Sequence, residues 1–489
     1  MPTDLTGEPD LLDTPGAGPA AIRGAALRVG AYGLGALLSV IAAALLFRHL
    51  GLIDIGRYTI VISMIALVGG LSDAGLTSIG MRELSVQSGP ARRVTSSDLL
   101  GVRIVISVLG VAGMVIFSLL AGYADVVVTG VLIGGVGLVL QSCQSTLSLS
   151  LLSRLRLGWI SAIGLAGQAT SVLLIAVLVA ANARLLAFVA VTIPAAAVGL
   201  VLTVIKVRGD VPLIPTLHRK RWRRLLRMVL PYSIAVAATA IYLQMSVVLV
   251  SLIANAHQLG LFSTSFRIVT ALMPIPGLLV GSVFPIFARA ARDDKARLAY
   301  AVDRVFQTSL ILGVWIALAV AIGAPVAIQI ITGGGSFKAA NGVLAIQGLA
   351  LGPMFIGTVW GNVLLSLQRL RAIMYFNLAF LAVGAVLVGV LVSVDGARGA
   401  AIGNAAIETI EAIVGGIVVV RNDPRLMPSL ASLPRVALAA AIGAAPILLD
   451  APAVVELVLS SAAYAAALVA LRLIPAELTD EIRRLRARR

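Results

Sequence analysis

The chain has 489 residues, of which 59% are hydrophobic and only 12% are charged, and its mean hydropathy is +1.03. A soluble domain is usually about 45–50% apolar with about 25% charged residues, so this composition excludes a soluble globular protein. The net charge of +16 does not indicate nucleic-acid binding, because the basic residues gather at one set of span ends, where they would face anionic lipid headgroups.

The chain begins with an acidic, Pro/Gly-rich segment of 22 residues, which we expect to be a disordered tail and not a cleavable signal peptide. Apolar runs of about 20 residues then recur from residue 25 almost to the end, and no alternating strand pattern favours a barrel. The sequence therefore predicts an all-α polytopic membrane protein with about fourteen transmembrane helices. The predicted spans are 25–47, 58–80, 99–121, 126–150, 158–180, 184–205, 229–253, 261–287, 306–331, 341–366, 372–393, 399–420, 434–449 and 453–474.

The basic residues orient these spans. With both termini in the cytoplasm, 32 of the 38 Lys and Arg residues fall on the cytoplasmic side or at the adjacent span ends, as the positive-inside rule requires. The prevalence of Arg over Lys, together with much Ala and Val, suggests a GC-rich bacterial genome. We expect the protein in a bacterial cytoplasmic membrane.

Two pseudo-symmetric six-helix bundles form the predicted body of the protein. The fragments 55-IGRYTIV-61 and 259-LGLFSTS-265 match at an offset of 204, and span four ends in 151-LLSRLR-156 where span ten ends in 364-LLSLQRLR-371. Even numbers of spans in each half make the repeats parallel. The predicted segments are a tail at 1–22, the first bundle at 23–205, a basic amphipathic cytoplasmic linker at 206–228, the second bundle at 229–420, helices 13 and 14 at 421–474, and a basic cytoplasmic tail at 475–489.

Corresponding helices of the two halves carry helix-breaking residues. At the offset of 204, Gly69 and Gly70 of span two align with Met273 and Pro274 of span eight, whose stretch 274-PIPGLLVGSVFP-285 contains Pro274 and Pro276. Such interruptions in matching helices indicate a transporter's binding site and its hinges. The alternative is that Gly and Pro are simply common in membrane helices.

Acidic residues within the spans need an explanation, because a charge at mid-bilayer costs about 2.5–3.5 kcal/mol on insertion scales. Asp73 lies in span two. In span twelve, Asn404, Glu408 and Glu411 are spaced so that they share one helix face. We assign these four residues to ion coupling or gating. Two alternatives stay open: Asp73 only ties span two to a neighbour, or the glutamates form structural pairs with Arg267.

Candidate substrate-binding residues are basic, amide or aromatic. Arg267 in span eight is the first candidate for phosphate recognition, because its planar guanidinium suits bidentate binding, and Arg28 near the inner end of span one is the second. Side chains suited to sugars are those of Tyr242, Gln244, Gln347, Trp360 and Asn377.

The sequence offers no sign of catalysis. It has no Gly-rich phosphate loop, no metal-ligand cluster, no Ser/His/Asp set and no outer loop long enough for a catalytic domain, so we expect no enzyme, no cofactor and no metal site. The one cysteine, Cys143, lies in an apolar span and excludes an intramolecular disulfide.

Two stretches of the sequence resemble the polysaccharide flippases. The run 47-FRHLGLIDIGRYTIV-61 followed by 73-DAGLTSIGMRELS-85 is similar to the start of that family, and 242-YLQMSVVLVSLIANAHQLGLFSTSFRI-268 is similar to its span-seven/eight pattern. These flippases, O-antigen (Wzx-type) and lipid II flippases among them, belong to the multidrug/oligosaccharidyl-lipid/polysaccharide (MOP) exporter superfamily. Asp73 falls on the family aspartate and Arg267 on a basic family position, while Ser246 stands where many relatives carry an acid.

The resemblance implies a transporter with two bundles that moves a polyprenyl-(pyro)phosphate-linked oligosaccharide from the inner to the outer leaflet for cell-envelope polysaccharide biosynthesis. Expected partners are this lipid-linked glycan, anionic inner-leaflet lipids and cell-envelope polysaccharide assembly proteins. The alternatives are a drug/cation antiporter of the same superfamily, a membrane glycosyltransferase or polymerase, and a non-transporting assembly scaffold.

Overall fold

The computed structural model describes residues 17–473, apart from residues 74, 88, 155, 211, 213 and 217. The predicted tails at 1–22 and 475–489 therefore lie wholly or mostly outside the described residues. Within the described part, every regular element is helical, and twelve helical segments are long and apolar enough to cross a membrane. One of these segments contains two spans, and the apolar part of a further helix is Gly33–His49, so the predicted fourteen spans correspond to the observed helices.

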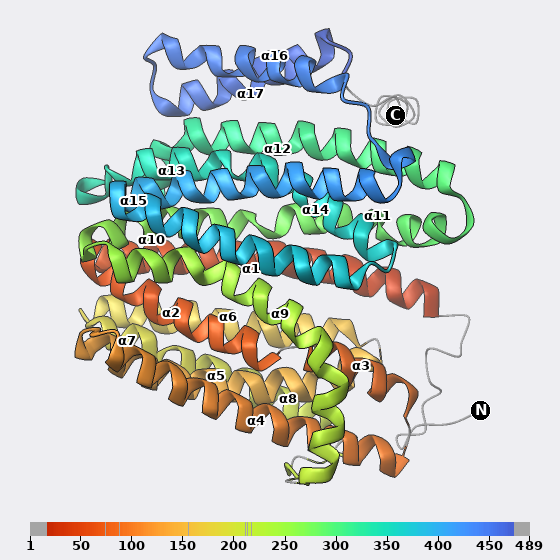
Figure 1. Cartoon of the computed structure of the whole chain (residues 1–489). Coiled ribbons are helices and arrows are strands. Elements are labelled where there is room, and N and C mark those ends of the chain that lie inside the picture. Colours follow the sequence, from red (N-terminus) through yellow and green to blue (C-terminus); the bar gives the residue numbers. More distant parts are fainter. Residues whose placement is uncertain are drawn as a thin grey trace. The chain divides into compact units, whose positions relative to one another are not determined.

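The chain divides into two compact units, Met1–Val248 (unit 1) and Leu249–Arg489 (unit 2). The helices of unit 1 are seen in the red to green part of Figure 1. They are α1 (Ala17–His49), α2 (Leu52–Asp73), α3 (Leu76–Val86), α4 (Gly89–Leu120), α5 (Asp125–Ser153), α6 (Leu157–Ala180), α7 (Leu185–Ala190), α8 (Thr192–Val207) and most of α9 (Arg219–Ile253). In unit 1, α5 packs against α4, α8 and α2, and α1 packs against α6.

Unit 2 repeats this pattern and adds a pair of helices, α16 and α17, that lie side by side and pack on α12 (Figure 1). Its elements are α10 (Ala256–Leu272), α11 (Pro274–Asp293), α12 (Lys295–Thr332), η2 (Gly335–Phe337), α13 (Ala340–Leu349), α14 (Leu351–Ser366), α15 (Leu370–Asn422), η3 (Pro424–Leu426), α16 (Ser432–Ala444), η4 (Ala445–Leu449) and α17 (Ala453–Ala470).

Local sequence explains where helices start and stop. The Asn255 side chain accepts the backbone N–H of Gln258 at 2.9 Å at the start of α10, and Asp294 accepts two backbone N–H groups at the start of α12. These are the preferred N-cap residues, because their side chains satisfy amides that have no partner within the helix. Helix α12 ends at Gly333, whose φ of 77° is the left-handed conformation favoured after a helix C-terminus.

Helix α15 is a helical hairpin and not one long span. Asp395 and Gly396 have non-helical backbone angles. Beyond them the chain runs back along itself so closely that a Cβ on Gly399 would lie 1.8 Å from the carbonyl oxygen of Leu391. The two arms of α15 are the predicted spans eleven and twelve.

Both units interrupt the same helix of the repeat. Helices α2 and α10 begin at residues 52 and 256, an offset of 204, and each ends inside the membrane-length segment it starts. In unit 2 the interruption falls at Met273, directly before Pro274. In unit 1 it falls between Asp73 and Gly75, whereas Gly69 and Gly70 lie within α2, where a Cβ on Gly70 would lie 2.5 Å from Cβ of Ala240.

The predicted linker at 206–228 differs from the observed backbone. Its second part is helical and continues into the span without a break, as the first turns of α9, while residues 208–218 contain no helix in their described positions. The boundary between the units falls within α9, after Val248.

Candidate functional site

The acidic residue Asp73 is the last residue of α2. Gly75 follows with a φ of 83°, a left-handed conformation that residues with a side chain rarely adopt, and α3 starts at Leu76. The chain therefore breaks its helix directly after the carboxylate. Thr77, in the first turn of α3, donates its hydroxyl hydrogen bond to Asp73 Oδ1.

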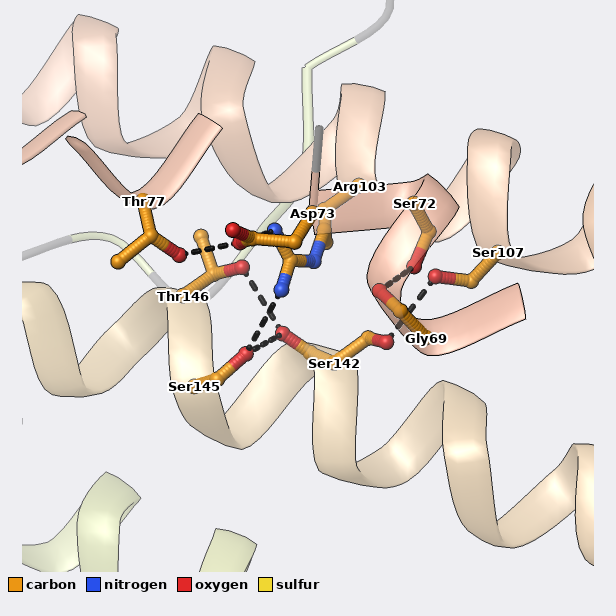
Figure 2. Close-up of polar contacts among 9 residues, drawn as sticks. All are labelled: Gly69, Ser72, Asp73, Thr77, Arg103, Ser107, Ser142, Ser145 and Thr146. Atoms are coloured by element: carbon orange, nitrogen blue, oxygen red, sulfur yellow. Dashed lines mark hydrogen bonds and ion pairs between the residues drawn. The ribbon is translucent and has the colours of Figure 1, made fainter. Parts of the chain in front are cut away.

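Arg103 of α4 is the charge partner of Asp73. Its Nη1 donates to Asp73 Oδ1 at 2.5 Å, and its Nη2 donates to Ser145 Oγ of α5 at 3.4 Å (Figure 2). The Arg103 side chain is 8% exposed and that of Asp73 is 31% exposed. Loss of the Asp73 carboxylate would leave the buried Arg103 guanidinium unpaired, and an uncompensated buried charge costs about 3–5 kcal/mol.

A row of hydroxyl groups continues from the ion pair along α4 and α5 (Figure 2). Ser107 Oγ donates to Ser142 Oγ at 3.0 Å, and the hydroxyls of Ser145 and Thr146 both donate to the Ser142 carbonyl oxygen. Ser107, Ser142 and Thr146 are buried. The arrangement places a salt bridge and several hydroxyls inside an apolar bundle, where polar groups are retained for binding, for coupling or for fixing one packing geometry.

A second buried carboxylate, Asp98 of α4, holds the connection between α8 and α9. The Asp98 side chain is 3% exposed and accepts hydrogen bonds from Thr216 Oγ1 at 2.5 Å and from the Arg221 guanidinium, whose Nε lies 2.7 Å from Oδ2. The backbone adds two bonds, from Thr216 N to the Ser97 carbonyl and from Ser97 Oγ to the Ile214 carbonyl. We call residues 208–222 the strap, because they are fastened across the start of α4.

The polar residues predicted in unit 2 lie on several helices. Asn404, Glu408 and Glu411 are on the second arm of α15, and all three are partly exposed. Arg267 is exposed on α10, and its carbonyl oxygen accepts the hydroxyl of Thr270 at 3.0 Å. The coupling roles of the three α15 residues and the phosphate-binding role of Arg267 stay predictions.

Two residues predicted to meet sugars are buried in unit 2. Trp360 is 4% exposed, its indole N–H donates to the Ala412 carbonyl at 2.8 Å, and its ring lies 5.5 Å from that of Phe306. Gln347 is 2% exposed, and neither polar atom of its amide has a hydrogen-bond partner among the described residues. Contact of either side chain with a sugar would need a conformation different from this one. Asn377, on the first arm of α15, is partly exposed.

The remaining predicted residues belong to unit 1. Tyr242 and Gln244 are partly exposed on α9. Arg28 lies in α1, but its side chain is outside the described residues. The described part of the chain contains no cluster of three or more His, Cys, Asp or Glu side chains that could hold a metal ion.

Arg103 is not among the candidate residues selected from the sequence, and its ion pair with Asp73 was therefore missed. The available signal was its position inside the predicted span 99–121, where the rule that selected Asp73 applies equally to a cation. Asp98, one residue before that span, gave no comparable signal.

Comparison with known proteins identifies the family of this chain. The family model described as "Polysaccharide biosynthesis protein" matches residues 45–336, which include both Asp73 and Arg103. No curated protein matches the sequence significantly.

Solved structures share the fold at low sequence identity. The structure of the lipid II flippase MurJ in an inward closed conformation superposes with a TM-score of 0.76 at 13% identity and covers 91% of this chain and 99% of that one. An inward-facing multidrug resistance MATE transporter of the MOP superfamily gives a TM-score of 0.62 at 15% identity, covering 82% and 98%. A MOP superfamily transporter from Pyrococcus furiosus gives 0.55 at 15% identity, covering 84% and 96%. The chain shares the fold of these transporters and belongs to the family of polysaccharide biosynthesis proteins.

Proposed function

We propose that this protein translocates a polyprenyl-(pyro)phosphate-linked oligosaccharide from the inner to the outer leaflet of a bacterial cytoplasmic membrane, for cell-envelope polysaccharide biosynthesis. The protein acts as a transporter and not as an enzyme. Both termini lie in the cytoplasm, and the basic ends of its spans face anionic inner-leaflet lipids. Cell-envelope polysaccharide assembly proteins are its expected partners.

One observation carries the proposal: a chain of a polysaccharide biosynthesis family keeps a buried, charged and hydroxyl-rich site at a helix break within its membrane bundle. A lipid-linked sugar needs such a site, because its headgroup must leave water while its lipid tail stays in the bilayer. The similarity to a structure of the lipid II flippase supports the same class of cargo.

Alternating access requires contacts that differ between the two states of the transporter. The Asp73–Arg103 pair is suited to this task, because it links the broken segment α2/α3 to the continuous helix α4. The groups on α10 and α15, Arg267 with Asn404, Glu408 and Glu411, would serve phosphate binding and coupling in unit 2. Hinge motion would use the interruptions beside Pro274 and Gly75.

The test is a lipid extraction after depletion of the protein in its native cell, followed by mass spectrometry of polyprenyl-linked glycans. Accumulation of one such species, reversed by the wild-type protein, is the expected result, and it also identifies the cargo. Unchanged lipid-linked and surface glycans would contradict the proposal.

A drug/cation antiporter is the second candidate, and the similarity to MATE structures favours it. It predicts loss of drug resistance on depletion with no accumulated glycolipid. The same depleted cells, tested for growth on cationic drugs, separate the two functions.

A further inference from the structure

The buried guanidinium of Arg103 has fewer hydrogen-bond acceptors around it than it has N–H donors. Its side chain is 8% exposed. Nη1 donates to Asp73 at 2.5 Å, Nη2 reaches Ser145 Oγ only at 3.4 Å, and Nε is buried without a hydrogen-bond partner among the described residues. Because a guanidinium carries five N–H donors, this arginine has donors to spare inside the protein.

Asp73 meets this cation with a single oxygen. Oδ1 accepts from both Thr77 and Arg103, while Oδ2 takes part in no hydrogen bond within the described part of the chain. The strongest arginine–carboxylate pairs use two parallel N–H···O bonds, and this pair does not. The carboxylate is also 31% exposed, so the pair is not sealed from its surroundings.

The two partners differ in their freedom to move. Asp73 is the terminal residue of α2, and Gly75, with its left-handed conformation, separates α2 from α3, so the Asp73 carboxylate can move away with a change at Gly75. Arg103 lies inside the continuous helix α4, which packs against α5 over its length. If the pair opens, the acid leaves and the cation stays behind, buried.

A buried cation left in this way must be compensated, or the open state becomes strongly disfavoured. We infer that Arg103 is an anion-binding residue of unit 1. In the absence of cargo, the Asp73 carboxylate binds to the Arg103 guanidinium. A phosphate or pyrophosphate group displaces this carboxylate when cargo binds. This inference rests on the proposed function, since it adds Arg103 of α4 to Arg267 as a residue that binds the phosphate groups of the cargo.

The surroundings of Arg103 suit such a group. The Thr77 and Ser145 hydroxyls that now contact the ion pair are donors for phosphate oxygens. The N-terminus of α3, an 11-residue helix, begins at Leu76, beside the carboxylate, and helix N-termini favour anions. When the cargo phosphate displaces the Asp73 carboxylate, it also breaks the ion pair between α2 and α4, so α2 is released from α4 only when cargo is bound.

The test uses the full-length protein in nanodiscs of zwitterionic lipid, titrated with inorganic pyrophosphate by isothermal calorimetry. Asp73→Asn removes the internal competitor and keeps the shape, so we expect pyrophosphate to bind at least tenfold more tightly than to the wild type. The double variant Asp73→Asn/Arg103→Gln, which removes both charges, is expected to bind none. Equal affinity of Asp73→Asn and wild type, no measurable binding to Asp73→Asn, or retained binding by the double variant would each overturn the inference.

Arg103→Lys supplies a second readout that keeps the positive charge. In the Asp73→Asn background it is expected to bind pyrophosphate more weakly than the parent, because lysine lacks the planar fork of donors. Unchanged affinity would mean that charge alone attracts the anion and would contradict direct binding by the guanidinium. If depletion causes glycolipid accumulation but these titrations fail, the inference alone is wrong; if depletion has no effect, the proposed function fails while the titrations still report on Arg103.

Discussion

At the scale of single residues, the most informative pair is Asp73 and Arg103, whose contacts give each charge a role that depends on the other. The sequence pattern indicated Asp73 as a site residue but did not indicate Arg103. The residue type of Trp360 suits sugar stacking, and in this structure its ring packs against Phe306 and its N–H donates to the Ala412 carbonyl. Residue type indicates what a side chain can do, and its neighbours decide what remains available.

The ion pair predicts a specific pattern of stability. Arg103→Gln leaves the partly exposed Asp73 carboxylate without its counter-ion and is expected to lower the free energy of unfolding by about 1.5–3 kcal/mol, whereas Asp73→Asn/Arg103→Gln removes both charges and costs less. Unfolding by SDS titration of the protein in detergent measures both. A double variant less stable than the single one would contradict the pairing.

Substitution of Trp360 distinguishes a role in packing from direct contact with the cargo. Trp360→Phe loses the hydrogen bond to the Ala412 carbonyl and part of the packing, so we expect about 1–3 kcal/mol lower stability. Glycolipid transport per folded molecule should be nearly unchanged. A large drop in transport with unaltered melting temperature would instead place the ring in the cargo site.

At the scale of elements, the strap and the α15 hairpin both depend on close tertiary contacts, which the hydrophobic periodicity of the sequence does not reveal. The strap is fastened to α4 by Asp98, and the arms of α15 approach each other at glycines. Within the predicted basic amphipathic linker, Arg221 is bonded to a buried carboxylate and Trp222 packs against the core formed by α3, α4 and α5.

Loss of the Asp98 carboxylate should loosen the strap. A hydrogen bond to a charged group contributes about 1.5–3 kcal/mol, so Asp98→Ala is expected to accelerate trypsin cleavage at Arg208 by roughly tenfold or more. Asp294→Ala, which removes an exposed helix cap in unit 2, is the matched control and should leave that cleavage unchanged. Equal cleavage of Asp98→Ala and wild type would exclude a fastening role.

The α15 hairpin predicts a sharp difference between two glycines. Gly399→Ala would place a Cβ 1.8 Å from the Leu391 carbonyl oxygen, so we expect loss of the folded protein, seen as aggregation on size exclusion. Gly389→Ala has 3.9 Å to the nearest atom and should fold as the wild type does. Normal folding of Gly399→Ala would contradict the close approach of the arms.

At the scale of the whole molecule, the repeated order of helices and the distribution of basic residues decide the topology. The expected fourteen spans would place both termini on one side, and the positive-inside rule predicts that this side is the cytoplasm. The single cysteine makes this testable, since Cys143→Ser gives a cysteine-free background.

In that background, Arg93→Cys lies in the second turn of α4, and Ala124→Cys lies beyond the other end of α4, at the N-cap of α5. A membrane-impermeant maleimide added to intact spheroplasts is expected to label Ala124→Cys and to leave Arg93→Cys unlabelled until the membrane is opened. The reverse pattern would invert the orientation, and labelling of both would remove a span from the count.

The sequence by itself determined the class of fold, the approximate ends of the spans, the repeat and the family resemblance. These follow from local properties, because lipid requires each segment to be helical and apolar over about 20 residues, and proline or a turn glycine acts on its own neighbours. Tertiary structure alone decided the partner of Asp73, the burial of Trp360 and the fastening of the strap by Asp98. Those outcomes join residues 30 or more positions apart, through contacts that only the packing of specific helices creates.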